Sequence, residues 1–306
     1  MHRHRVKGAR PGRFRLLVQL MTAAVLNGYA AGIARGHIFT GKSKAVCVPV
    51  LNCWSCPGAL GACPIGALQA VAGGGKHRIS FYVLGFLVLC GTLLGRLLCG
   101  FFCPFGLVQD LLAKIPLKKI TVPEKADRLL RYVKYAILLI FVLLLPAAVT
   151  NALGTGDPWF CKYICPAGTL EAGIPLVLRT PALRRAAGVL FSWKCAVLLA
   201  ILLGAVKIPR VFCRYLCPLG AFYGLFNRFS LYQMKAAQEK CIGCGQCEAV
   251  CPMALRIPAE LSSSECIRCG KCSAVCPAGV FGRKNNTDTE EMHHDILSDS
   301  GQAESE

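Results

Sequence analysis

Charged side chains are scarce in this chain of 306 residues. Asp, Glu, Lys and Arg together make up 17% of it, whereas hydrophobic residues make up 54%. Apolar runs of about 17–25 residues are the signature of helices that cross the ~30 Å hydrocarbon core of a bilayer. The composition therefore indicates a protein with a large membrane-embedded part.

Acidic residues are the rarer of the two charge types, with 16 Asp and Glu against 35 Lys and Arg, which gives a formal net charge of +19. The basic residues gather at the ends of apolar segments, with six in residues 1–15 and eight in residues 96–134. Lys and Arg near such ends mark the cytoplasmic side of a membrane protein. We therefore expect a multi-pass protein of the cell (inner) membrane with both termini in the cytoplasm, and no nucleic-acid partner.

Motifs of several cofactor and catalytic classes are absent. The chain contains no C-x2-C-H haem motif, no flavin-attachment motif and no convincing Ser/His/Asp arrangement. Residues 36–43 match a Walker A string, but they follow an apolar segment and run into Cys47 and Pro49. A P-loop needs a preceding strand and a following helix, so we expect neither nucleotide binding nor catalytic residues.

Four apolar segments predict transmembrane helices, over residues 14–34, 79–95, 135–153 and 186–206. The alternative, buried helices of a large soluble core, is disfavoured because runs such as 137–145 have no polar face. The first segment has a basic start but no small-residue cleavage site, so it is predicted to be a retained signal anchor. Lys194 lies in the fourth segment, where a charge is costly; it marks a functional contact, a snorkelling side chain or a shifted segment.

Cysteine is abundant, with 20 residues, and eight of them form two copies of C-x2-C-x2-C-x3-C-P. In this pattern each [4Fe-4S] cluster takes three cysteines from one copy and the fourth from the other. We therefore predict one cluster on Cys241, Cys244, Cys247 and Cys276, and a second on Cys266, Cys269, Cys272 and Cys251. Zinc knuckles also use C-x2-C, but zinc would leave the second spacing and the C-P of each copy unexplained.

A further cysteine element, ending in C-P-x-G, follows each apolar segment, so the chain reads as two pseudo-repeated halves. Because consecutive spans alternate in direction, the second and fourth elements should share one membrane face, and the first and third the other. A cubane cluster needs four thiolates. The sequence therefore predicts a shared inner-face [4Fe-4S] cluster on Cys99, Cys103, Cys213 and Cys217, and an outer-face cluster on Cys56, Cys63, Cys161 and Cys165.

Several alternatives stay open for these cysteines. Either Cys47 or Cys53 could replace Cys56 as a ligand, and the six outer cysteines could instead form disulfides in an oxidising compartment. The inner C-x3-C pairs could bind zinc or simply pack. Cys90 and Cys195 lie within apolar segments and are expected to behave as small apolar residues. Backbone amides of the C-P-x-G turns are expected to hydrogen-bond cluster sulfurs and raise reduction potentials.

Four regions follow from these patterns. They are a basic cytoplasmic N-terminus (1–13), a four-helix membrane domain (14–232), a two-cluster ferredoxin domain (233–284) and an acidic tail (285–306) with too few apolar residues to fold. The expected fold class is an all-α polytopic membrane domain joined to a small α+β ferredoxin-like domain.

Residues 239–283 resemble the bacterial two-cluster ferredoxins, and residues 14–283 resemble the membrane polyferredoxins of the NapH, MauN and NosR group. The second resemblance rests on the C-x3-C-P elements at Cys99 and Cys213 and on the eight ferredoxin cysteines. It implies that electrons pass between a membrane or cytoplasmic donor and a reductase or maturation system outside. The chain departs from the group in the extra elements at 53–63 and 161–165 and in lacking the flavin-binding domain of the NosR branch, so no pathway is transferred.

The expected function is electron transfer through [4Fe-4S] clusters, from a cytoplasmic or quinol donor to a membrane or extracytoplasmic acceptor, with redox proteins as partners. A redox-sensing or metalloenzyme-maturation factor would use the same clusters and is the alternative. The protein is expected to be an electron carrier, or a subunit of a quinol oxidoreductase, rather than a stand-alone catalyst.

Overall fold

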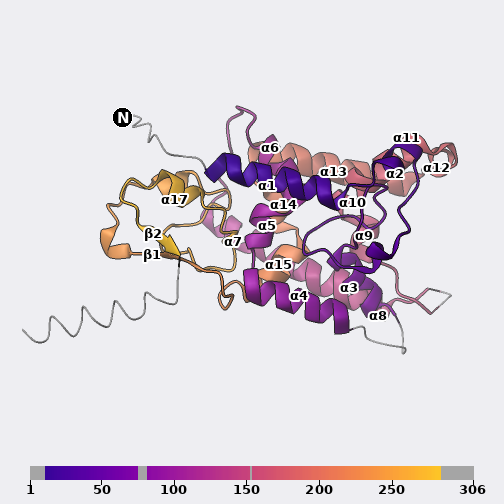
Figure 1. Cartoon of the computed structure of the whole chain (residues 1–306), viewed down its shortest axis with the longest axis horizontal. Coiled ribbons are helices and arrows are strands. Elements are labelled where there is room, and N and C mark those ends of the chain that lie inside the picture. The colour runs from indigo at the N-terminus through magenta and orange to yellow at the C-terminus, as the bar shows by residue number, and fades with distance from the viewer. Residues whose placement is uncertain (1–10, 75–80, 152–153, 284–306) are drawn as a thin grey trace, which may run out of the picture.

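The structure is a computed structural model that describes residues 11–74, 81–151 and 154–283. The predicted acidic tail and most of the predicted N-terminal region lie outside the described residues. The described chain is mostly helical, with a small lobe at one end of the long axis that contains both of its strands (Figure 1).

Four helical passages run along the long axis of the molecule (Figure 1). They are α1 (Pro11–Leu26), α4 (Phe81–Leu94), a continuous helix over Glu124–Ala148, and α13 (Val189–Lys207). The third passage consists of α7 (Glu124–Ile137), a π-helical stretch (Leu138–Leu144) and α8 (Leu145–Ala148).

Two of these passages are long and apolar enough to cross a membrane. In the part of the chain that the structure describes, they are Glu124–Ala148 and Val189–Lys207, with mean hydropathies of 2.0 and 2.3. Only 28% and 17% of their most apolar windows are buried, so most of this apolar surface faces outward. The predicted segment 79–95 corresponds to the shorter apolar helix α4, and the predicted segment 14–34 is divided between α1 and α2 (Ala30–Arg35).

The passages alternate in direction relative to the small lobe. Arg15, near the start of α1, lines one cavity together with Lys271 and Ala274 of α17 in the lobe. Arg268 of the lobe donates to the carbonyl of Leu94 at the end of α4, at 3.3 Å. Arg131, near the start of the third passage, donates to the carbonyl of Met253 in the lobe, at 3.2 Å. The second and fourth cysteine elements therefore lie beside the lobe, and the first and third lie at the far end.

Each cysteine element folds as a short helix or loop followed by a helix that begins at proline. The Pro-initiated helices are α3 (Pro64–Ala72), α6 (Pro104–Leu112), α10 (Pro166–Gly168) and α15 (Pro218–Phe226), and the short helices before three of them are α5 (Leu97–Phe101), α9 (Trp159–Tyr163) and α14 (Val211–Tyr215). Proline suits the first helical position because its φ is pre-set and its missing N–H would have no partner there. The cysteine before each proline therefore occupies the N-cap position, at a chain reversal inside the protein. After α10, a π-helical turn (Thr169–Gly173), α11 (Ile174–Arg179) and α12 (Pro181–Ala186) lead to α13.

The small lobe contains an antiparallel pair of strands, β1 (Met234–Ala236) and β2 (Phe281–Arg283), with Lys235 opposite Gly282. Its helices α16 (Gln246–Ala249) and α17 (Lys271–Val275) each start after a glycine with positive φ, Gly245 at 68° and Gly270 at 72°. Glycine adopts this left-handed conformation without steric cost. The strand pair thus brings the segment before the first cysteine run next to the segment after the second run.

A buried polar network fixes the lobe to the helical part. The fully buried Arg96 donates to Glu265 of the lobe at 2.9 Å, and Lys134 of α7 pairs with the same carboxylate. Asn227 donates to the carbonyls of Ser263 at 2.7 Å and Cys266 at 3.0 Å. One continuous apolar core contains cysteines from both parts, so the lobe is an integral part of the core.

Candidate cluster-binding sites

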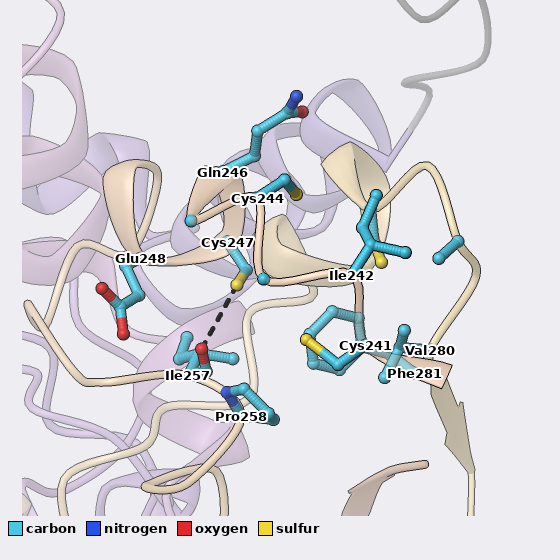
Figure 2. Close-up of a pocket in the computed structure, with 14 residues that line it drawn as sticks. Cys241, Ile242, Cys244, Gln246, Cys247, Glu248, Ile257, Pro258, Val280 and Phe281 are labelled. Carbon is cyan, nitrogen blue, oxygen red and sulfur yellow. Dashed lines mark hydrogen bonds between the residues drawn. The ribbon is translucent and has the colours of Figure 1, made fainter. Parts of the chain in front are cut away.

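The first ferredoxin site is the set of Cys241, Cys244, Cys247 and Cys276. All four line one cavity of about 210 Å³ in the lobe, and Figure 2 shows three of them around it. The Cys247 thiol donates to the carbonyl of Ile257 at 3.4 Å (Figure 2). Cys241 and Cys244 are exposed, so this site lies at the protein surface.

The second ferredoxin site is the set of Cys251, Cys266, Cys269 and Cys272, which line another cavity in the lobe. Burial, together with the neighbouring Cys269, Cys266 and Cys251, raises the pKa of the Cys272 thiol to about 12. Ile257 lines both ferredoxin cavities. Each cavity thus gathers three cysteines of one run and the fourth cysteine of the other.

The inner site is the set of Cys99, Cys103, Cys213 and Cys217, beside the lobe. All four are buried. Burial raises the pKa of the Cys217 thiol, and Cys213, Cys99 and Cys103 raise it further because all four lie near one another. Short helices α5 and α14 provide one cysteine each, and the N-caps of α6 and α15 provide the others.

Two fully buried arginines connect the halves of the inner site. Arg210 donates to the carbonyl of Cys99 at 2.7 Å, and Arg96 donates to the carbonyl of Cys213 at 3.0 Å. Arg210 also pairs with Asp110, which in turn accepts from Arg15 at 2.9 Å. Burial raises the pKa of Asp110, but Arg210 and Arg15 outweigh burial and lower it to about 2. The inner site is therefore surrounded by two charge groups that each contain two cations and one anion.

The outer site differs from the predicted set in one cysteine. Burial raises the pKa of the Cys165 thiol, and the neighbouring Cys161, Cys53 and Cys63 raise it further. These four cysteines also line one cavity. Cys56, the predicted ligand, instead packs against Ala59 and Ala172 and donates its S–H to Asn27 at 3.5 Å. The outer site is therefore defined here as Cys53, Cys63, Cys161 and Cys165.

The outer cavity is larger than the cavity at the first ferredoxin site. Its volume is about 570 Å³, against about 210 Å³ at the first ferredoxin site. Lys194 of α13 and Asn52 line it, and the fully buried Asn52 side chain has no hydrogen-bond partner for either polar atom. A buried amide without partners is costly, so Asn52 indicates a polar or anionic group in this cavity.

The glycine of each C-P-x-G element provides an amide to the cysteine sulfur. The Gly220 N–H donates to the Cys217 Sγ at 3.4 Å, and the Gly168 N–H donates to the Cys165 Sγ at 3.4 Å. The corresponding amides of Gly66 and Gly106 lower the pKa of Cys63 and Cys103, against the larger effect of burial. The predicted backbone hydrogen bonds to these sulfurs are thus present.

The residue six positions after each C-P cysteine was missed by the sequence reasoning. These residues are Gln69, Gln109, Glu171 and Tyr223. Glu171 accepts from the backbone N–H of Cys53 at 2.8 Å, and burial raises its pKa to about 7 even though this hydrogen bond lowers it. The signal was available in the repeat, because all four positions carry a side chain with a polar atom in largely apolar helical segments.

Tyr223 lies between the inner and outer sites. It is fully buried, and its hydroxyl donates to the carbonyl of Pro49 at 3.0 Å. Burial raises its pKa, and thiols on both sides, including Cys99 and Cys63, raise it further. The Tyr223 side chain thus connects α15, which begins after Cys217 of the inner site, to the loop before Cys53 of the outer site.

The donor chemistry of all four sites fits [4Fe-4S] clusters. Each site offers four cysteine sulfurs and no other cluster ligand is needed. None of the twenty cysteines, all of which the structure describes, forms a disulfide. Among the described residues, no three His, Cys, Asp or Glu side chains converge on the position of a single metal ion.

Comparisons with known proteins agree with this chemistry. Residues 61–82, 80–123, 135–179 and 190–235 match a family described as a 4Fe-4S binding domain. Residues 233–277 match a 4Fe-4S dicluster domain. Together the first matches cover both halves of the helical part, and the second covers the lobe.

Curated relatives are also ferredoxin-type proteins. The methylamine utilization ferredoxin-type protein MauN of Paracoccus denitrificans is 33% identical over 55% of this chain and 50% of its own length. The ferredoxin-type protein NapH of Haemophilus influenzae is 31% identical over 56% of this chain and 54% of its own. An uncharacterized protein of Methanocaldococcus jannaschii is 33% identical over 60% of each chain. The match thus spans about half to three fifths of these relatives, and no solved structure matches the chain.

Proposed function

The chain belongs to the 4Fe-4S binding-domain family, as a polyferredoxin like NapH and MauN, and from this premise we propose that it is a membrane electron wire with four [4Fe-4S] clusters in series. The observation that carries the proposal is the row of four tetracysteine sites along the molecule. The sites run from the exposed first ferredoxin site, through the second ferredoxin site and the inner site, to the outer site.

Specific contacts link each site to the next. Ile257 lines both ferredoxin cavities. A Cβ on Gly100, next to Cys99 of the inner site, would lie 2.4 Å from the carbonyl oxygen of Ile267 in the lobe, so only glycine permits this approach. Tyr223 lies between the inner and outer sites. Each pair of neighbouring sites is therefore joined through residues of the protein core.

The apolar surface supports a position in the membrane. We assign the four passages as four spans, with the lobe and both termini on the cytoplasmic side of the cell membrane. Exposed apolar side chains on α1 and α13, among them Met21, Val25, Leu199 and Leu203, support contact with lipid. Arg96 and Arg210 mark the cytoplasmic end, in keeping with the charge distribution.

The chain's own residues would hold the clusters and set their reduction potentials. The sixteen thiolates of the four sites would hold the clusters, which supply the one-electron chemistry. Burial, amide hydrogen bonds and nearby charges tune the potential of each cluster. The exposed first ferredoxin site would receive electrons from, or deliver them to, a soluble redox protein, and the outer site would serve an extracytoplasmic partner.

The size of the outer cavity favours a second candidate, in which a quinol exchanges electrons with the outer cluster. The cavity is largely apolar, and Lys194 and Asn52 could donate hydrogen bonds to a quinone carbonyl. Anaerobic addition of a short-chain quinol would then reduce the outer cluster, as monitored by EPR. A redox sensor or maturation factor would show no such reaction and only slow turnover between donor and acceptor.

The test of the wire is iron and acid-labile sulfide analysis of anaerobically purified protein, with EPR of the reduced form. Four cubanes predict about sixteen iron per chain, since each contributes four. The double variant Cys99→Ser and Cys213→Ser should lose about four iron and block transfer across proteoliposomes from external dithionite to an entrapped acceptor. A count of about eight iron in the unmodified protein would limit the clusters to the lobe and contradict the wire.

A further inference from the structure

Gln69 and Gln109 hold equivalent positions at the outer and inner sites. Each lies six residues after a C-P cysteine, and each is fully buried. The Nε2 of Gln109 donates to the Sγ of Cys213 at 3.1 Å, and the Nε2 of Gln69 donates to the Sγ of Cys161, also at 3.1 Å. In both sites, an amide from the first half of the chain thus reaches a cysteine of the second half.

The orientation of each amide is fixed by the backbone. The Oε1 of Gln69 accepts from the N–H of Phe160 at 2.9 Å, and the Oε1 of Gln109 accepts from the N–H of Phe212 at 3.0 Å. A backbone N–H can only donate, so the oxygen must face it and the NH₂ group must face the sulfur. The amide therefore cannot rotate without losing both contacts.

Such a donor acts on the redox state of a cluster. A cluster becomes more negative when it is reduced, and an N–H group pointing at a ligand sulfur stabilises that extra charge. Hydrogen bonds to the sulfurs are among the features that set the potentials of iron–sulfur clusters. Both amide ends are satisfied in the core, so neither glutamine is an uncompensated buried polar group.

We propose that Gln69 and Gln109 are paired tuning residues, each raising the reduction potential of the [4Fe-4S] cluster at its own site through its amide hydrogen bond to Cys161 or Cys213. They are positioning residues that bind no iron themselves. The inference rests on the proposed function, because it requires a cluster at both the inner and the outer site.

Gln109→Glu and Gln69→Glu test it with little change in shape. An ionised glutamate keeps the oxygen that accepts from the backbone N–H and replaces the donor near the sulfur with a second oxygen. Because burial raises the pKa of a carboxyl group, the titrations are run at alkaline pH, where the new side chain is ionised. Each variant should lower the midpoint potential of its own cluster in an EPR-monitored redox titration and leave the other cluster unchanged. The two variants are therefore matched controls for each other, with signals assigned by Cys53→Ser and Cys99→Ser.

Iron analysis separates the two possible failures. If the unmodified protein holds only about eight iron, two cubanes' worth, the proposed function fails, and this inference with it. If all clusters are present in both glutamate variants and neither potential falls, the inference alone is overturned.

A measurement on the unmodified protein covers the case in which a glutamate variant loses its cluster. Protein grown with glutamine labelled by ¹⁵N at the side-chain amide should show ¹⁵N hyperfine coupling to the reduced inner and outer clusters in pulsed EPR. The coupling should disappear at one cluster when the corresponding glutamine is replaced by leucine. Absence of ¹⁵N coupling at both clusters would overturn the inference.

Discussion

Arg210 donates a hydrogen bond of 2.7 Å from its Nη1 to the backbone carbonyl of Cys99, more than a hundred residues earlier in the chain. Arg96 makes the reciprocal contact with the carbonyl of Cys213 at 3.0 Å. Each arginine lies three residues before the C-x3-C pair of its own half. Its side chain hydrogen-bonds the first cysteine of the pair in the other half. The two buried arginines thus connect the two halves of the inner site.

Replacing Arg210 with methionine should destabilise the protein by about 3–5 kcal/mol. The substitution removes one of the two ion pairs of the buried Asp110 and the contact with Cys99. Breaking a buried charge network by removing one partner costs this much. The measurement is the temperature at which cluster absorbance is lost under anaerobic conditions in detergent.

Arg128→Met is the matched control for this variant. Arg128 pairs with Glu124 on the surface, where both side chains are more than 60% exposed. Such a pair is worth about 0–1 kcal/mol, so the melting temperature should barely move. Equal effects of the two arginine variants would contradict the role assigned to Arg210.

The inner cluster should have a higher reduction potential than the outer cluster. Two groups of charges surround the inner site, Arg96–Lys134–Glu265 and Arg210–Arg15–Asp110, and each has an excess of one positive charge. The corresponding positions at the outer site carry no arginine. Positive surroundings favour the added electron, because charge effects are strong in a low-dielectric core.

The two potentials can be assigned by redox titration followed by EPR, with Cys99→Ser and Cys53→Ser each removing one signal. An outer cluster that is reduced before the inner one would show that charge does not order the two sites. In that case, solvent or a bound ligand in the outer cavity would have to set the order of the two reduction potentials.

Cys53 and Cys56 should respond differently to substitution by serine. Cys53→Ser should remove about four iron per chain, the content of one cubane, because Cys53 lines the outer cavity. Cys56→Ser should leave the iron content unchanged, since its thiol lies in a separate apolar cluster and bonds to Asn27. Loss of iron only in the Cys56 variant would restore the ligand set expected from spacing.

Gly100→Ala should weaken the contact between the lobe and the inner site. The new Cβ would lie 2.4 Å from the carbonyl oxygen of Ile267, so the backbone must move, at a cost of about 1–3 kcal/mol for overpacking. Electron transfer between the second ferredoxin site and the inner site should slow, as measured by freeze-quench EPR after rapid reduction.

Gly85→Ala in α4 provides the control, because a Cβ there meets nothing within 4 Å. Alanine at an open helical position stabilises by about 0.5–1 kcal/mol relative to glycine. If Gly100→Ala leaves both stability and transfer rate as they are in the unmodified protein, the close approach at Gly100 has no role in the relay.

The cysteine spacing by itself determined most of the chemistry. The repeated runs at Cys241 and Cys266 specify two exchanged sets of four thiols, and the structure brings those sets together. The C-P-x-G repeat also predicted that Cys99 and Cys103 would meet Cys213 and Cys217. These arrangements are readable because cluster ligation constrains residues at fixed, short separations.

The tertiary structure decided what depends on packing between distant segments. It brings Cys53 rather than Cys56 to the outer cavity, because the loop before α3 turns Cys56 towards Asn27. It divides the predicted segment 14–34 between two helices. It also brings Arg96, Arg210 and the two glutamines to the opposite half of the chain. No local pattern encodes such contacts, since their partners lie about a hundred residues away and are set only when the two halves fold together.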